Sequence, residues 1–435
     1  MGHLVGKEIY RKLGGKIDGM ETRTPWNDKL YAILKELYSG EEADFVVRMP
    51  YGLSTLNELV KATGFEKGAL SRILDGLTGK GLVMDLWLDE EFRYMPSPMI
   101  IGIFEFTMMR TGGNLKSREW AKLFEDYMYG DASFLRANHG KGERISTFRA
   151  LPHEDVFIGS DYSEVLDYEK ASALIAETDK FAIGLCACRH KKMHLGEKEC
   201  DVPLETCSTL GDAADFMIRN NFAREVTRSE MEENFARSRE MGLVLIADNV
   251  QKNVKFVCHC CGCCCDLLQG ITKFGYPNII VTSNFIPEIN IDTCTGCGKC
   301  AKSCPINAVT MVAAEGPGEK RHVMIDDSIC IGCGVCALKC PKQACAMANR
   351  GNRVIHPETT FERIMLQSLE KGTLQNQIFA NPQGMNEKVM RAFVGAFLKL
   401  PPVKRALMSD KLRSRFLDAM KDGVRKQGKE WLLDM

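Results

Sequence analysis

A cysteine pattern that occurs twice, 36 residues apart, constrains this chain more than any other feature. The first copy reads CTGCGKCAKSCP from Cys294, and the second reads CIGCGVCALKCP from Cys330. Three thiols spaced two residues apart on a tight turn can converge on one centre. The fourth thiol of each copy follows three residues later and precedes a proline, which redirects the chain, so we expect it to point elsewhere. The segment should therefore fold around two metal centres.

The spacing C-x2-C-x2-C-x3-C-P resembles that of bacterial ferredoxins with two 4Fe-4S clusters, in which the fourth cysteine of each run ligates the other cluster. The resemblance covers about residues 289–350 and implies one-electron transfer at low potential without catalysis. It implies one cluster ligated by Cys294, Cys297, Cys300 and Cys340, and a second ligated by Cys330, Cys333, Cys336 and Cys304. Zinc is the alternative, but zinc does not require eight cysteines in two crossed runs.

Eleven of the 19 cysteines lie outside the repeat, and ten of these precede it. The exception, Cys345, is expected to be a small buried core residue. A first upstream group consists of Cys186, Cys188, Cys200 and Cys207. Four thiolates suffice for a third cubane, and Arg189 beside them would stabilise an anionic cluster. A zinc site is the alternative interpretation.

The second upstream group is the segment CHCCGCCC, which contains Cys258, Cys260, Cys261, Cys263, Cys264 and Cys265. Neighbouring side chains on a regular backbone diverge, so these six cannot all hold one metal ion. Either the segment coils around a cluster and leaves some thiols as spectators, or it divides its ligands between two sites. The ten upstream thiols could then hold one or two further iron–sulfur clusters, including a non-cubane form. Thiol storage or redox sensing is the competing interpretation.

Cysteine usage also bears on location. The first residues lack the apolar core of a signal peptide, and no stretch approaches the ~18 apolar residues that span a bilayer. We therefore expect a cytoplasmic protein, in which 19 thiols favour metal or redox chemistry over disulfides. Acidic and basic residues balance at 57 each, so net charge favours neither a nucleic acid nor a membrane as partner.

Residues 54–96 predict a helix, a turn, a second helix and a hairpin with a charged tip. Thr55 and Glu58 form a capping-box pattern, Gly64 marks the turn, and Asp89 to Glu91 form the tip. This order resembles the winged-helix domain of many transcriptional regulators. The segment carries seven acidic and five basic side chains, whereas a surface that binds duplex DNA should be basic. We expect a structural or docking domain, with DNA binding as the less favoured alternative.

These patterns predict an α+β multidomain protein with four parts. They are a winged-helix-like domain with flanking helices (1–130), a small α/β cysteine-rich domain (131–285), a ferredoxin-like domain with two 4Fe-4S clusters (286–350) and a helical C-terminal extension (351–435). The extension carries 15 basic and nine acidic residues. We expect its amphipathic helices to pack on the domain before them.

Taken together, the pieces CACRH, CDVPLETC and CHCCGCCC before a ferredoxin repeat resemble a group of multi-cluster iron–sulfur proteins from strict anaerobes. The resemblance implies electron transfer to or from a redox partner protein or enzyme complex, with no catalytic residue of the chain's own. One alternative is a redox-sensing transcriptional regulator that uses the winged helix. Another is a reductase subunit whose upstream cluster has an open coordination site. No glycine-rich nucleotide motif or P-loop is present.

Overall fold

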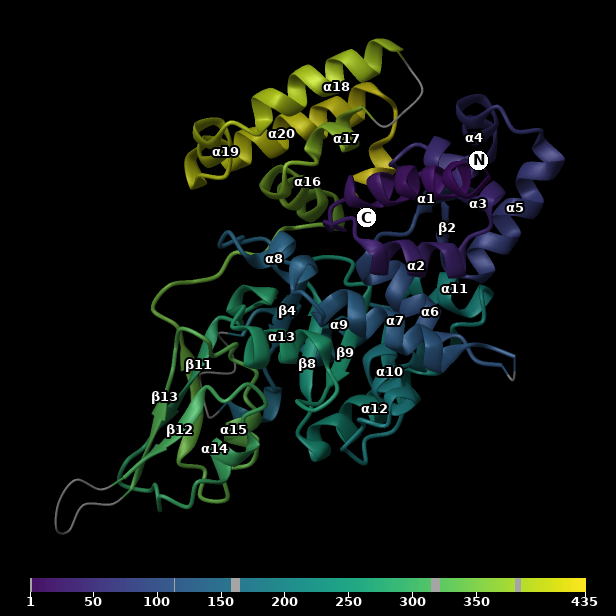
Figure 1. Ribbon diagram of the computed structural model, residues 1–435. Helices are drawn as coiled ribbons and strands as arrows, with labels where there is room; N and C mark the ends of the chain where they lie inside the picture. The colour runs from purple at the N-terminus through teal and green to yellow at the C-terminus, as the bar shows by residue number, and fades with distance from the viewer. Residues whose placement is uncertain (1, 113, 158–164, 314–320, 380–384) are drawn as a thin grey trace.

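The computed structural model describes residues 2–112, 114–157, 165–313, 321–379 and 385–435. It is a mixed α+β structure in which a central sheet lies between an N-terminal helical region and the ferredoxin-type segment (Figure 1). The C-terminal helices lie over the N-terminal region, at the opposite end from the ferredoxin-type segment (Figure 1).

The N-terminal region combines helices with a small antiparallel sheet. Its helices are α1 (Gly2–Asp18), α2 (Asp28–Leu37), α3 (Gly40–Arg48), α4 (Leu56–Thr63) and α5 (Lys67–Gly79), and its strands are β1 (Ser54–Thr55), β2 (Val83–Leu88) and β3 (Glu91–Pro96). The sheet has the order β1-β3-β2. The capping box between Thr55 and Glu58 is confirmed, and Gly64 ends α4 in the left-handed conformation, as its position predicts.

A seven-stranded sheet forms the centre of the molecule. Its strands, in spatial order, are β10 (Ile280–Val281), β4 (Phe148–Leu151), β8 (Val244–Asp248), β9 (Phe256–Cys260), β6 (Glu205–Leu210), β5 (Phe181–Leu185) and β7 (Ala223–Glu225). All neighbours are antiparallel except β10 and β4. Side chains alternate between the two faces along each strand, so the sheet has two distinct apolar faces.

Helices cover both faces of this sheet. One face packs on α9 (Ala171–Ala176) and α12 (Arg228–Met241), through residues such as Met231 and Phe235. The other face packs on α6 (Phe104–Met109), α10 (Ala187–Leu195), α11 (Gly211–Arg219) and α13 (Asp266–Phe274). Helices α7 (Ser117–Tyr129) and α8 (Ser133–His139) join this second face to the N-terminal region. The upstream cysteines of the sheet and its helices belong to the second of these two layers.

The ferredoxin-type segment shows the internal repeat in its structure. Its first half contains β11 (Phe285–Ile289), α14 (Lys299–Ser303) and β12 (Val309–Val312), and its second half contains β13 (His322–Ile325), α15 (Val335–Leu338) and β14 (Cys345–Asn349). Strand β11 pairs antiparallel with β14, and β12 pairs with β13. The outer strands thus bring the start and end of the segment together around the cysteine loops.

The C-terminal helices pack on distant parts of the chain. They are α16 (Thr360–Lys371), α17 (Leu374–Ile378), α18 (Met385–Leu398), α19 (Pro401–Leu407) and α20 (Asp410–Lys426). The carboxylate of Glu370 accepts hydrogen bonds from the backbone of Arg144 and Ile145, and Asn376 donates to the Gly19 carbonyl. We expected these helices to pack on the preceding ferredoxin-type segment. These contacts instead join them to the N-terminal half of the chain.

Gly332 offers a direct test of how closely the cysteine loops pack. Its φ is +69°, and an added Cβ would lie 2.2 Å from the Phe285 carbonyl oxygen and 2.2 Å from the Ser283 hydroxyl. We expect Gly332→Ala to destabilise the segment by about 3 kcal/mol, because backbone strain and overpacking add. Anaerobic thermal unfolding measures this change. Gly351→Ala is the matched control, since nothing lies within 4 Å of its Cβ, and equal melting temperatures for the two variants would contradict the expectation.

Within the described part of the chain, no helix is long and apolar enough to cross a membrane.

Candidate metal centres

The first predicted ferredoxin set is gathered around a small apolar cavity. Cys294, Cys297, Cys300 and Cys340 all line it, together with Ile289, Val323 and Ala344. Cys340 comes from the second copy of the repeat, so the fourth thiol crosses over to the other set. The N–H of Lys299 donates to the Cys297 sulfur, which lowers the pKa of that thiol. Thiols around an apolar cavity with amide donors fit a 4Fe-4S cluster.

The second set, Cys304, Cys330, Cys333 and Cys336, lies deeper in the protein. Cys304 faces the other three closely enough for their charges to interact. Burial raises the pKa of Cys330 and Cys333, while N–H groups of Gly332 and Val335 donate to their sulfurs. This set fits the same kind of cluster. Cys345 is a buried core residue, 4% exposed, and its sulfur lies 3.9 Å from that of Cys336.

The ten upstream thiols separate into a six-thiol site and a four-thiol site. The six-thiol site consists of Cys186, Cys188, Cys207, Cys258, Cys260 and Cys265, whose thiols interact in one continuous series: Cys186 with Cys188, then Cys265, Cys260, Cys258 and Cys207. The four-thiol site consists of Cys200, Cys261, Cys263 and Cys264. The expected grouping of Cys200 with Cys186, Cys188 and Cys207 is therefore replaced, because Cys200 lies with the second cysteine segment.

Strand periodicity explains how β6 and β9 contribute to the six-thiol site. Cys258 and Cys260 are two residues apart on β9 and share one face, while His259 between them points to the α12 side and stacks edge-on against Phe235. On β6, Cys207 points to the same face as Cys258, and Gly184 lies opposite it on β5. The missing side chain of Gly184 leaves room beside this thiol.

Two helix N-termini contribute the remaining thiols of the six-thiol site. Cys186 is the N-cap of α10 and Cys188 lies in its first turn, while Cys265 is the N-cap of α13. The positive end of a helix dipole stabilises thiolates at such positions. Cys265 accepts hydrogen bonds from Cys188 and Cys260, which lowers the pKa of Cys265 to about 5. By contrast, thiol neighbours and burial raise the pKa of Cys188, Cys207 and Cys260.

Arg189 lies between the two upstream sites and is fully buried. Its guanidinium donates to the Pro203 carbonyl at 2.8 Å, the Thr206 hydroxyl at 2.7 Å and the His259 carbonyl at 2.6 Å. Burial alone would lower the pKa of Arg189, but the thiolates of Cys186 and Cys261, one from each site, raise it. Arg189 therefore serves as a shared counter-charge.

A second buried cation lies beside the six-thiol site. Lys191 has no exposed side-chain surface, and its Nζ lies 2.7 Å from Asp266 and 2.5 Å from Glu125. Tyr129 donates to the same Asp266 carboxylate at 2.8 Å. Burial also raises the pKa of Glu105, which faces Cys258, to about 8, so this carboxyl is protonated at neutral pH. A buried lysine and a buried arginine side chain thus flank the site, and the Glu105 carboxyl beside Cys258 is neutral.

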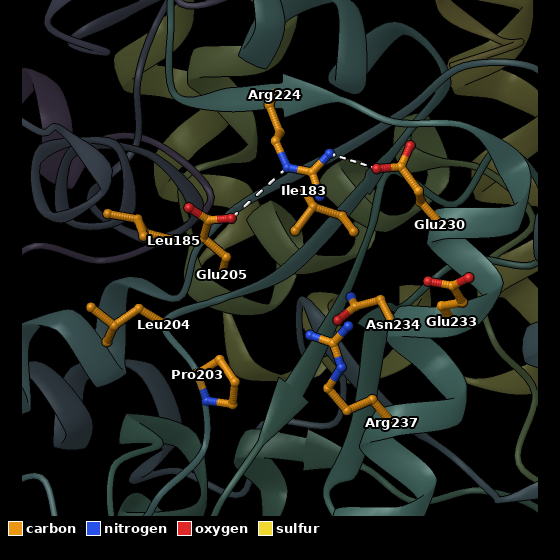
Figure 2. A pocket seen from close by; sticks show the side chains of 10 residues that line it. All are labelled: Ile183, Leu185, Pro203, Leu204, Glu205, Arg224, Glu230, Glu233, Asn234 and Arg237. Carbon is orange, nitrogen blue, oxygen red and sulfur yellow. Dashed lines mark hydrogen bonds and ion pairs between the residues drawn. The ribbon is translucent and has the colours of Figure 1, made fainter.

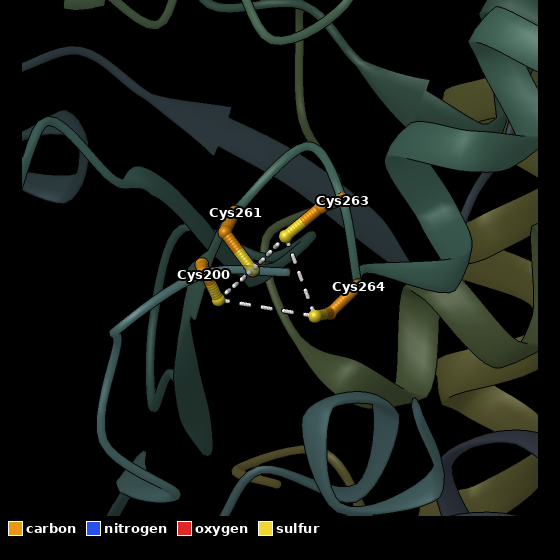
Figure 3. Close-up of side chains that lie close together, drawn as sticks. All are labelled: Cys200, Cys261, Cys263 and Cys264. Carbon is orange, nitrogen blue, oxygen red and sulfur yellow. Dashed lines mark hydrogen bonds between the residues drawn. The ribbon is translucent and has the colours of Figure 1, made fainter. Parts of the chain in front are cut away.

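The four-thiol site is a compact loop structure. Residues 261–264 form a tight turn, closed by a hydrogen bond from Cys265 N to the Cys261 carbonyl at 3.1 Å, and Cys200 reaches it from the loop before β6 (Figure 3). Val202 and Leu243 pack against Cys261 and Cys264, which are 9% and 1% exposed. Four thiols in one place, two of them buried and two half-buried, can hold a metal.

The upstream sites touch the second ferredoxin set directly. A Cβ on Gly262 would lie 3.1 Å from the carbonyl oxygen of Pro305, which follows Cys304. The buried residue His153 connects the four-thiol site to the second ferredoxin set. Its Nε2 lies 2.8 Å from the carbonyl oxygen of Leu243, which packs on the four-thiol site, and its backbone N–H donates to the Cys333 carbonyl. Thiols of the six-thiol site and of the second ferredoxin set also belong to one continuous apolar core. The six-thiol site and the second ferredoxin set are therefore packed into the same core.

A cavity of about 500 Å³ opens on the opposite side of the sheet. Arg224 spans it, at 2.9 Å from Glu230 and 3.9 Å from Glu205, and Asn234 of α12 lies at its floor (Figure 2). Asn234 is bonded to Ser208, whose side chain points away from the thiol face of β6. The sheet therefore separates this cavity from the six-thiol site.

The sequence places Arg189 and Lys191 beside the upstream thiols, but sequence reasoning missed how those thiols divide and the presence of Glu105 among them. Strand parity was the available signal for part of the division, because Cys258 and Cys260 are two residues apart on a strand and share one face. Parity does not extend into the following turn, where Cys264 and Cys265 belong to different sites. Nothing in the sequence marks Glu105 as a neighbour of Cys258, since it lies more than 150 residues earlier.

The family described as the 4Fe-4S dicluster domain matches residues 293–344. This match and the cysteine clusters support an iron–sulfur protein with electron-transfer function. Neither the curated proteins nor the solved structures contain a significant match to the chain.

Proposed function

We propose that this chain is a multi-centre electron-transfer protein, with two ferredoxin clusters and at least one further iron–sulfur cluster in the six-thiol site. The continuity between that site and the second ferredoxin set carries the proposal. A 4Fe-4S cluster, when bound, accepts and releases one electron at low potential. The partner is a redox protein or enzyme complex that exchanges electrons with the chain.

The chain's residues are suited to holding such centres and to keeping water away from them. Thiols on two helix N-termini and two strands surround the six-thiol site, and Arg189 and Lys191 supply positive charge without solvent. Charged groups that are held in place inside the protein move little when a site gains or loses an electron. The reorganisation energy of electron transfer is therefore small. The more exposed first ferredoxin set, with Cys297 at the surface, offers a docking end for the partner.

Electron uptake tests this function. Anaerobically purified protein, reduced stepwise with a low-potential donor, should accept at least about three electrons per chain, one for each cubane. Each reduced centre should give a paramagnetic signal that returns to baseline on reoxidation. An uptake of about two electrons would confine the redox centres to the ferredoxin segment and contradict the proposal.

The alternative of a DNA-binding regulator is disfavoured by how the β2–β3 hairpin is used. Arg219 of α11 lies 2.8 Å from Asp85 and over the ring of Phe92, at 4.9 Å from its centroid. On the other strand, Arg93 stacks on Trp431 at 4.1 Å. Both strands of the hairpin therefore contact other parts of the chain. The tip that remains consists of Asp89, Glu90 and Glu91, whose negative charge would repel DNA phosphates.

We therefore expect no shift of duplex DNA by the protein in a gel assay at low salt, where phosphate contacts are strongest. Cluster-loaded and oxidised protein should behave alike. Salt-dependent binding that changes with oxidation would instead favour the regulator.

The reductase alternative needs a substrate space beside an open metal site. The 500 Å³ cavity lies across the sheet from the six-thiol site, which supports an electron carrier over a reductase.

A further inference from the structure

The four sulfur atoms of the four-thiol site form a closed ring of short edges. Cys200 lies 3.5 Å from Cys261 and 3.9 Å from Cys264, and Cys263 lies 3.7 Å from Cys261 and 3.4 Å from Cys264 (Figure 3). All four atoms are within 4.8 Å of one another. Figure 3 shows the four side chains pointing toward a common centre.

These edges have the size of a single tetrahedral metal site. Zinc–thiolate bonds of about 2.3 Å place the four sulfurs of a tetrahedron roughly 3.8 Å apart. A cubane attaches each thiolate to a different iron atom, so its sulfurs stand farther apart than thiolates that share one ion. The ferredoxin sets provide the comparison within this protein: among the described residues, no other group of Cys, His, Asp or Glu side chains brings three ligand atoms as close together.

We propose that Cys200, Cys261, Cys263 and Cys264 bind one tetrahedral metal ion, Zn²⁺ or Fe²⁺, and not an iron–sulfur cluster. Four thiolates fill every coordination position, which is typical of a structural site closed to substrate. A divalent ion with four thiolates has a net charge of −2, and the guanidinium of Arg189 next to Cys261 offsets part of it. The soft sulfur donors exclude Mg²⁺ and Ca²⁺, which require oxygen ligands.

The ion would fasten two loops at the junction with the ferredoxin segment. Cys200 belongs to the loop that continues to Leu204, whose carbonyl accepts a hydrogen bond from Cys186 N at 2.8 Å. The other three ligands flank Gly262, which rests on Pro305. Holding Cys200 to this turn therefore fixes both the loop that is hydrogen-bonded to Cys186 and the turn that contacts Pro305.

Metal and sulfide analysis of a Cys200→Ala variant tests the proposal. Compared with the parent chain, the variant should lose one equivalent of zinc or iron per chain and keep its acid-labile sulfide unchanged, because a single ion holds no inorganic sulfide. Whether the lost metal is zinc or iron identifies the ion. Loss of about four irons together with four sulfides would show a cubane and overturn the proposal. Unchanged metal content would also overturn it.

A Cys200→His variant keeps the test decisive if the alanine variant does not fold. Three cysteines and one histidine form an established zinc set, so this variant should retain the single ion. With Co²⁺ supplied during expression, it should show the visible bands of a tetrahedral thiolate site. Absence of those bands in a soluble, sulfide-replete protein would contradict a mononuclear site. These results do not test the electron-transfer proposal, because that proposal depends on the six-thiol site and is tested by electron uptake.

Discussion

A Cys207→Ala/Cys258→Ala variant should leave anaerobic purification with at least about four fewer irons and four fewer sulfides per chain than the parent protein. The two thiols interact across the β6–β9 pair and supply the sheet side of the six-thiol site. Without them four thiols remain, but three of these, Cys186, Cys188 and Cys265, come from the helix N-termini and only Cys260 comes from the sheet, so we expect the remaining set to lose its cluster. Iron and acid-labile sulfide analysis measures the loss, and the ferredoxin signals should persist.

The size of the loss carries further information. A cubane uses four thiolates and would leave two of the six as spectators, whereas loss of about eight irons would indicate a larger centre that uses all six. Cys345→Ala is the matched control, because it also removes a buried thiol but one outside both upstream sites. Unchanged iron in the double variant would contradict ligation by Cys207 and Cys258, and an equal loss in the control would contradict a specific effect of the two substitutions.

Replacement of Arg189 should have the largest effect on stability of any single charge in the molecule. Arg189→Met removes three buried hydrogen bonds to Pro203, Thr206 and His259 and leaves the thiolates of two sites without their shared counter-charge. Breaking a buried charge arrangement costs about 3–5 kcal/mol. For a domain of this size the melting temperature should fall by roughly 10 °C. Anaerobic differential scanning calorimetry measures the shift.

Arg237→Met is the matched control for Arg189. It removes the same charge from the same region, but its side chain is exposed at the rim of the cavity on α12 (Figure 2). Exposed substitutions of this kind change stability by less than about 0.5 kcal/mol. Comparable melting temperatures for the two variants would contradict the role given to Arg189. Arg189→Lys should recover only part of the loss, since an ammonium cannot reach three acceptors in a planar fork.

Local patterns predicted the local structure well. The capping box at Thr55 and the turn at Gly64 are present where the sequence places them, because each depends on side-chain and backbone contacts within a few residues. The hairpin whose turn lies at Asp89 and Glu90 follows for the same reason. Such features need no knowledge of the rest of the fold.

The upstream centres could not be resolved in the same way. Cys200 is seven residues from Cys207 but belongs to another site, because β6 begins between them and directs Cys207 to the sheet face. The sheet order β8-β9-β6-β5 joins strands that are up to 50 residues apart, and sequence spacing does not encode that order. The amphipathic pattern of the C-terminal helices predicts that they pack on another part of the chain, but it does not identify residues 143–149 as that part.

The strand order of the central sheet also imposes a sequence of events on maturation of the protein. The last thiol of the six-thiol site, Cys265, is about 80 residues from the first, Cys186, and β9 must enter the sheet between β8 and β6 before Cys258 and Cys260 face Cys207. The ferredoxin ligands, by contrast, all lie within 47 consecutive residues. Clusters can therefore be inserted into the ferredoxin segment while the chain is still partly folded. The upstream centre can form only after the central sheet is complete.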